Sequence, residues 1–179
     1  MRVRFRRIDK QKLIREIDIA VAKLSKQSKL LKERIELFYK QAERLAREEL
    51  EDVSKKYLAG VVRLKKMRSG VESRIADLIF YKTQVETTPP EELGPIAERT
   101  NEVLMEASRY WERTQREMGR LEALTSIEVE VPEEAPYGVS REELDEELRK
   151  MHERIVGKME FPEVPRDFKS GEKAEKVKD

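Results

Sequence analysis

The stretch from Asp9 to Thr88 constrains this chain most, because it contains no proline and only two glycines, Gly60 and Gly70. Its apolar residues recur at alternating steps of four and three, which is the spacing of a coiled-coil seam. The first seam comprises Ile14, Ile17, Val21, Leu24, Ser28, Leu31, Ile35 and Phe38, in which Ser28 is the one polar member. The second comprises Leu50, Val53, Tyr57, Gly60, Leu64, Met67, Val71, Ile75 and Leu78. The pattern predicts an elongated all-α protein built on long helices.

The two seams differ in phase, since continuing the first by its own spacing leads to Glu49, one residue before Leu50. We interpret this slip as the tip of a hairpin within residues 41–49. The hairpin helices would span about Asp9–Lys40 and Leu50–Thr88. A single unbroken helix of about 120 Å is the alternative, because no glycine or proline marks a turn there.

The residues after the hairpin predict a further helical region over 89–125. Thr88 followed by Pro89 and Glu91 is typical of a helix start, with Thr88 as the N-cap. Gly94-Pro95 then restarts the helix, which is expected to run from Pro95 to about Leu124 and to pack across the open end of the hairpin.

Residues 126–139 are predicted to be a linker that interrupts the helical pattern. Ile127, Val129 and Val131 alternate with glutamates at the period of a strand, and prolines and a glycine follow. A last, acidic helix is predicted over 140–157, starting at Ser140 with a capping box closed by Glu143. Residues 158–179 are predicted to be a charged, disordered tail that contains a proline motif.

Charge is distributed unevenly along the chain. Hydrophobic residues make up 38% of the sequence and charged residues 42%, so a thick globular core is not expected. Residues 1–40 carry 13 basic and 5 acidic side chains, a net charge of +8, whereas residues 89–179 have a net charge of −9. The two ends of the chain would therefore attract each other, or partners of opposite charge.

The first eight residues are expected to contact a membrane surface. Arg2, Arg4, Arg6 and Arg7 are interleaved with apolar side chains, including Phe5. Arginines are attracted to anionic lipids and a few apolar side chains can enter the headgroup region. A nucleic-acid arm is an alternative, although one aromatic residue offers little base stacking. A basic tail without a dedicated partner is the third possibility.

The sequence offers no candidate residues for catalysis or for binding a cofactor or a metal, so we expect a non-enzymatic protein. There is no cysteine, and the one histidine, His152, lies in an amphipathic helix without a nucleophile nearby in sequence. The seven glycines are scattered, so no phosphate-binding loop or dinucleotide motif can be built. The lack of cysteine favours a reducing cytosol, and no apolar run approaches the length of a membrane span.

In the order of these features the chain resembles the ESCRT-III superfamily, in particular the archaeal cell-division proteins of the CdvB type. The shared features are a basic N-terminus, a long two-helix hairpin, further shorter helices, an acidic helix and a tail with prolines. The resemblance implies that Arg2–Arg7 contact the membrane, that the hairpin polymerises, and that Ser140–Val156 folds back as an autoinhibitory helix. The tail residues Phe161, Pro162, Val164 and Pro165 resemble the motif bound by the MIT domain of a partner AAA ATPase.

The function expected from this resemblance is filament formation at the inner face of the cell membrane, in cell division or membrane scission. The partners would be copies of the chain or its paralogues, an AAA ATPase that disassembles the filament, and an anionic membrane. Two other classes remain open. One is a coiled-coil scaffold, such as a rotary-ATPase stalk subunit. The other is a basic coiled coil that binds nucleic acid, although nucleic acid is a less favoured partner than the membrane.

Overall fold

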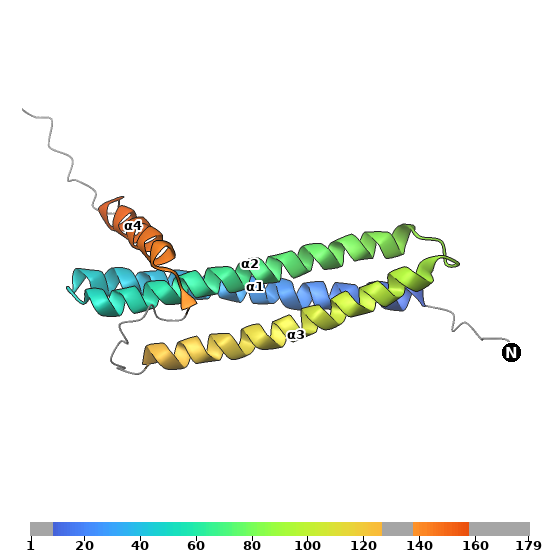
Figure 1. Ribbon diagram of the computed structural model, residues 1–179, viewed down its shortest axis with the longest axis horizontal. Coiled ribbons are helices and arrows are strands. Elements are labelled where there is room, and N and C mark those ends of the chain that lie inside the picture. Colours follow the sequence, from blue (N-terminus) through green and yellow to red (C-terminus); the bar gives the residue numbers. More distant parts are fainter. Residues whose placement is uncertain (1–8, 127–137, 158–179) are drawn as a thin grey trace, which may run out of the picture.

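The computed structural model describes residues 9–126 and 138–157, which form four helices (Figure 1). They are α1 (Lys10–Arg47), α2 (Glu51–Thr87), α3 (Leu93–Ser126) and α4 (Arg141–Gly157). Every regular element in this part of the chain is a helix, so the expected all-α class is confirmed. The strand-like alternation at Ile127, Val129 and Val131 lies outside the described residues.

Helices α1 and α2 lie side by side and run in opposite directions (Figure 1). Asp9 caps α1, its carboxylate accepting a hydrogen bond from the Lys12 backbone N–H at 3.1 Å. Where α1 begins and α2 ends, Lys10 Nζ donates to the carbonyl oxygen of Glu86 at 2.8 Å. Where α1 ends and α2 begins, Ser54 Oγ donates to the carbonyl oxygen of Ala42 at 2.9 Å. The chain therefore reverses direction and does not continue as a single straight helix.

The reversal takes place at Glu48–Leu50, later than the sequence pattern indicated. Helix α1 continues to Arg47, about two turns beyond the predicted end at Lys40, because Ala42 and Leu45 remain buried against α2. The Leu50 backbone N–H donates to the Leu45 carbonyl oxygen at 3.0 Å, which closes the helix end in a Schellman motif. Glu49 takes the left-handed position of that motif, with φ 61°. Glycine usually occupies this position, and its absence here left the turn without a sequence signal.

Replacing Glu49 with glycine is expected to raise the free energy of unfolding by about 1 kcal/mol, because glycine adopts the left-handed conformation without a Cβ clash. Urea denaturation followed by circular dichroism measures the change. Glu48→Gly is the matched control, since Glu48 has φ −86° and should gain nothing from glycine. An equal gain for both variants, or none for Glu49→Gly, would contradict the assignment of strain to this turn.

The core between α1 and α2 follows the first predicted seam closely. Ile17, Leu24 and Leu31 are at most 2% exposed, whereas Ile14 and Val21 are half-buried at the edge. The second seam is correct from Gly60 onward but wrong at its start, where Leu50 and Val53 are exposed. Five consecutive residues, Leu58–Val62, are buried instead, because α2 contacts α1, α3 and α4. A helix surrounded by several neighbours loses the simple period from which its buried face can be predicted.

Helix α3 runs back along the hairpin toward its tip, so the predicted packing across the open end is wrong (Figure 1). The Tyr110 hydroxyl donates to the Met67 carbonyl oxygen at 3.3 Å, and Arg63 pairs with Glu117. The helix begins at Leu93, slightly before the expected Pro95.

Thr88 ends α2 and does not cap the next helix, which corrects another prediction. Its backbone N–H and its hydroxyl both donate to the Gln84 carbonyl oxygen, at 3.0 Å and 2.7 Å. The hydroxyl therefore satisfies a carbonyl at the end of α2, whereas an N-cap side chain would accept a backbone N–H of the following helix.

Helix α4 starts as the sequence predicts. The Ser140 backbone N–H donates to Glu143 Oε2 at 3.0 Å, and the Glu143 backbone N–H donates to Ser140 Oγ at 3.2 Å. This is the reciprocal capping box. The apolar side of α4 packs on the main core through Leu144, Leu148, Met151 and Ile155.

Candidate functional site

Both functional segments predicted from the sequence lie outside the described residues. They are the proposed membrane-contacting residues Arg2, Arg4, Phe5, Arg6 and Arg7, and the proposed ATPase motif Phe161, Pro162, Val164 and Pro165. The structure instead provides two candidate surfaces within the helices. One is the junction at which α4 rests on the hairpin, and the other is the outer face of α1.

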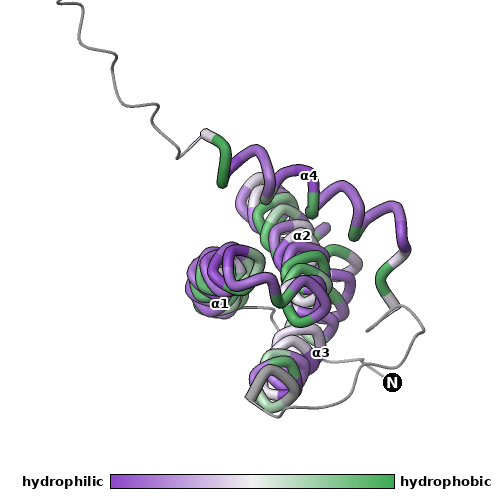
Figure 2. Tube along the Cα trace, turned by 90° about the vertical axis from the view of Figure 1, so that its left-hand side faces the viewer, coloured by the Kyte–Doolittle hydropathy of each residue, from purple (hydrophilic) through white to green (hydrophobic). Residues whose placement is uncertain are grey.

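At the junction, α4 crosses the hairpin in the half nearest its tip (Figure 1), and α4 and α3 lie on different sides of α2 (Figure 2). Met151 is the apolar anchor of this contact, since it is 1% exposed and its sulfur lies 3.7 Å from Ser54 Oγ. Val139, just before α4, is also buried and packs against Ala59 and Val62 of α2. The first part of α2 thus buries its side facing α4 as well as its side facing α1.

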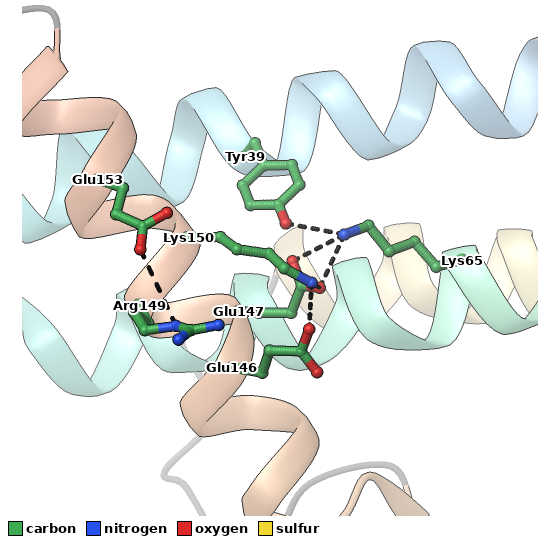
Figure 3. Close-up of polar contacts among 7 residues, drawn as sticks. All are labelled: Tyr39, Lys65, Glu146, Glu147, Arg149, Lys150 and Glu153. Atoms are coloured by element: carbon green, nitrogen blue, oxygen red, sulfur yellow. Dashed lines mark hydrogen bonds and ion pairs between the residues drawn. The ribbon is translucent and has the colours of Figure 1, made fainter.

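A carboxylate, Glu147, lies within the apolar face of α4 and is 5% exposed (Figure 3). Lys65 Nζ on α2 donates to both of its oxygens, at 2.7 Å and 2.8 Å, and to the Tyr39 hydroxyl of α1 at 3.0 Å. Lys150 adds a third bond to Glu147 at 3.3 Å. Burial of Lys65, reinforced by the nearby charge of Lys150, lowers the pKa of its amine. A buried carboxylate with several donors ties three helices together at one point.

Arg154 and Glu143 extend the polar contacts along both ends of α4. The Arg154 guanidinium lies 3.1 Å from carboxylate oxygens of both Glu36 and Glu43 on α1, and 4.6 Å from the centroid of the Tyr39 ring. Glu143 accepts from Lys66 of α2, with an N–O distance of 2.7 Å. Acidic residues of α4 thus meet lysines of α2, whereas Arg154 meets glutamates of α1.

These junction residues were missed in the sequence. The signal was present, because Glu147 interrupts an otherwise apolar spacing between Leu144 and Met151. A charged residue in an apolar stripe indicates a buried partner, but the sequence does not show that the partner is Lys65, which is 82 residues away.

The bond from Lys66, together with that from the Ser140 backbone N–H, lowers the pKa of Glu143. Because this pKa is lower in the folded state than in the unfolded chain, the stabilisation is present above the unfolded value and is lost as the pH falls through the folded one. We therefore expect the docking of α4 to weaken on acidification below about pH 4, and the effect should be modest because Glu143 is solvent-exposed. Hydrogen exchange of the α4 amides, followed against pH, measures the release.

In the Glu143→Gln variant the α4 amides should already exchange faster at neutral pH and should respond less to acid. Glu142→Gln is the control, because Glu142 is exposed on the same turn. If the two variants exchange alike at every pH, Glu143 does not hold α4 in place.

The groove between α4 and the hairpin has a volume of about 730 Å³. It is lined by charged residues of both signs, among them Lys32, Arg68, Glu72 and Glu153, around Tyr39. Within the described residues there is no cluster of three or more His, Asp or Glu side chains that could hold a metal ion. The side chains that line this groove are arranged as in a packing contact between helices.

The outer face of α1 is the second candidate surface, and it was also missed. Exposed basic side chains on this face lie among apolar side chains that are exposed as well, with Ile19 57%, Leu30 39% and Leu37 42% exposed. On a helix these positions fall on one side of the axis, and the exposed charged members of the face are the acidic Glu33 and the basic Lys12, Arg15, Lys23, Lys26, Lys40 and Arg44. The mixture of cations and apolar side chains is typical of a helix that lies on a lipid surface. The apolar seam lies on the buried side of this helix and gives no indication of what its other side presents.

The comparisons with known proteins give no family. No family model, curated protein or solved structure matches this chain. None of the helices in the described part of the chain is both long and apolar enough to span a membrane. A functional interpretation therefore rests on the surfaces themselves.

Proposed function

We propose that this chain is a non-enzymatic protein that binds anionic membranes from one side and assembles there into filaments that remodel them. The basic and apolar outer face of α1 is the observation that carries the proposal. Cations near an anionic leaflet contribute about 1 kcal/mol each, and exposed apolar side chains add to this on entering the interface. The segment Arg2–Arg7 lies just before α1 in the sequence and would add four further cations.

We propose further that docking of helix α4 regulates this assembly. In the docked state α4 covers an apolar part of the hairpin around Ser54, Leu58 and Val62. Release of α4 would uncover this surface for contact with other copies, so a closed subunit would not polymerise. An equilibrium of this kind shifts when a membrane or partner binds the open state more tightly.

By its resemblance to the ESCRT-III superfamily, the chain would act in cell division or membrane scission at the inner face of the cell membrane. A partner AAA ATPase would bind the tail at Phe161, Pro162, Val164 and Pro165 and disassemble the filament.

Negative-stain electron microscopy of the full chain, with and without anionic liposomes, tests the assembly. Filaments, rings or coated tubes are expected on the liposomes. Monodisperse particles beside bare vesicles would refute filament formation and favour a coiled-coil scaffold or stalk subunit.

Reversing two charges on α1, in the double variant Lys23→Glu and Lys26→Glu, should weaken binding to anionic liposomes by about 30-fold or more. Liposome co-sedimentation at low salt measures the affinity. The double variant Arg113→Glu and Arg116→Glu is the matched control, because these exposed arginines lie on α3. An equal loss in both would mean that net charge matters rather than the α1 face. Binding to DNA as tight as to liposomes would favour the nucleic-acid class.

A further inference from the structure

A groove between α1 and α3 opens on the face of the molecule that these two helices form (Figure 2). Its volume is about 320 Å³, which is the size of a small ligand pocket. The groove is not filled by its own walls, because small side chains, Ala20, Ala107 and Ser108, line it. Toward the hairpin tip, buried Gln27 of α1 donates from Nε2 to the Trp111 carbonyl oxygen at 3.2 Å, which holds α3 against α1 beside the groove.

The walls of this groove are mainly apolar, and two of its large side chains are exposed. Six of the ten lining residues are apolar, namely Ile19, Ala20, Leu24, Leu104, Ala107 and Trp111. Ile19 is 57% exposed on the α1 side, and Trp111, the one tryptophan of the chain, is 36% exposed on the α3 side. Large apolar side chains that remain exposed around a groove indicate a binding surface.

The charges around the groove indicate the chemistry of its occupant. Lys23 lines the groove and also belongs to the basic outer face of α1. Among the described residues no carboxylate forms an ion pair with Lys23. Of the two carboxylates in the lining, Glu16 lies 3.9 Å from the Lys12 amine, and Glu112 is on α3. An apolar groove that adjoins an unpaired cation and a basic helix face fits an amphiphile with a hydrocarbon chain and an anionic head.

We propose that this groove takes an acyl chain of an anionic phospholipid, with the phosphate at Lys23 and the Trp111 indole at the level of the headgroups. Tryptophan favours this level of a membrane because its ring is apolar while its indole N–H still finds polar partners. The inference rests on the proposed membrane binding and adds to it a lipid site that includes α3. Such a site would set how deeply the helices lie in the leaflet, because cations attract the protein to the surface without an apolar anchor.

Fluorescence of the full chain tests the site directly, because Trp111 is its one tryptophan. On vesicles of phosphatidylcholine and phosphatidylserine, the emission should shift to shorter wavelength, and lipids with brominated acyl chains should quench most of it. Acrylamide should quench Trp111 readily without vesicles and poorly with them. The control is the double variant Trp111→Phe and Phe80→Trp, because Phe80 is 56% exposed on α2 and a tryptophan there should not be quenched by the brominated chains.

Co-sedimentation with the same vesicles measures what the groove contributes to affinity. Ile19→Ser should weaken binding by about tenfold or more, with melting unchanged because the side chain is exposed. Ile79→Ser is the matched control, since Ile79 is 51% exposed but lies on α2, and it should bind as the unaltered chain does. The loss caused by Ile19→Ser should persist when salt is added, because salt screens the contribution of the cations and not that of an apolar side chain.

The outcomes separate the lipid site from membrane binding itself. If the chain binds the vesicles but brominated chains leave Trp111 unquenched, or if Ile19→Ser and Ile79→Ser bind equally well, the lipid site is wrong and membrane binding stands. If the unaltered chain does not sediment with the vesicles, both proposals are wrong. If acrylamide cannot reach Trp111 even without vesicles, another part of the chain or a second copy covers the groove, and the lipid site is again overturned.

Discussion

Replacing Gly70 with alanine is expected to lower the free energy of unfolding by about 2 kcal/mol, although alanine is the better helix former. A methyl group on Gly70 would overlap the Tyr110 hydroxyl and lie 2.5 Å from Cζ of the same ring. The ring cannot move freely, because its hydroxyl donates to the Met67 carbonyl oxygen and the Arg74 guanidinium lies 5.0 Å from its centroid. The variant must therefore push α3 away from α2.

Thermal or urea unfolding of Gly70→Ala measures this loss, and two further variants locate its cause. Gly119→Ala on α3 meets no atom within 4 Å and should be neutral or stabilise by up to about 1 kcal/mol through helix propensity. In a Tyr110→Ala background the cost of Gly70→Ala should vanish, because the clashing ring is gone. A cost that persists in that background would contradict the close approach of α3 at this glycine.

Met151→Asp should release α4 from the hairpin in most molecules. Met151 is 1% exposed among apolar neighbours and Ser54, so an aspartate there would bury a carboxylate without a cation, at a cost of several kcal/mol. The chain can avoid that cost by undocking α4. The substitution therefore cannot destabilise the folded chain by more than the free energy with which α4 docks. The α4 amides are expected to exchange about 100-fold faster or more, while the hairpin and α3 keep their protection.

Hydrogen exchange measured by mass spectrometry resolves α4 from the other helices. Val156→Asp is the control on the same helix, because Val156 is 62% exposed and should tolerate the charge. If Met151→Asp leaves α4 protected, the junction does not depend on this anchor. In the proposed function the released variant should also form filaments more readily than the unaltered chain, and electron microscopy of the two proteins side by side tests that consequence.

Local patterns in the sequence were enough to predict where α4 begins and which side of α1 is buried. The box formed by Ser140 and Glu143 is closed by residues three apart, and the seam through Ile17 and Leu31 reflects one helix packed on one partner. Interactions of this kind depend on neighbours along the chain, so spacing alone reveals them.

The sequence by itself therefore determined the helical class, the α1 seam and the capping of α4. Only the tertiary structure decided that the chain turns at Glu49, that α3 lies along the hairpin, and that Glu147 is buried against Lys65. These features depend on packing between segments that are distant in sequence. Such packing can offset the backbone strain of a glutamate in a left-handed turn, or the cost of burying a carboxylate. The spacing of residues along one helix does not reveal these contacts, because the groups that make them lie on other helices.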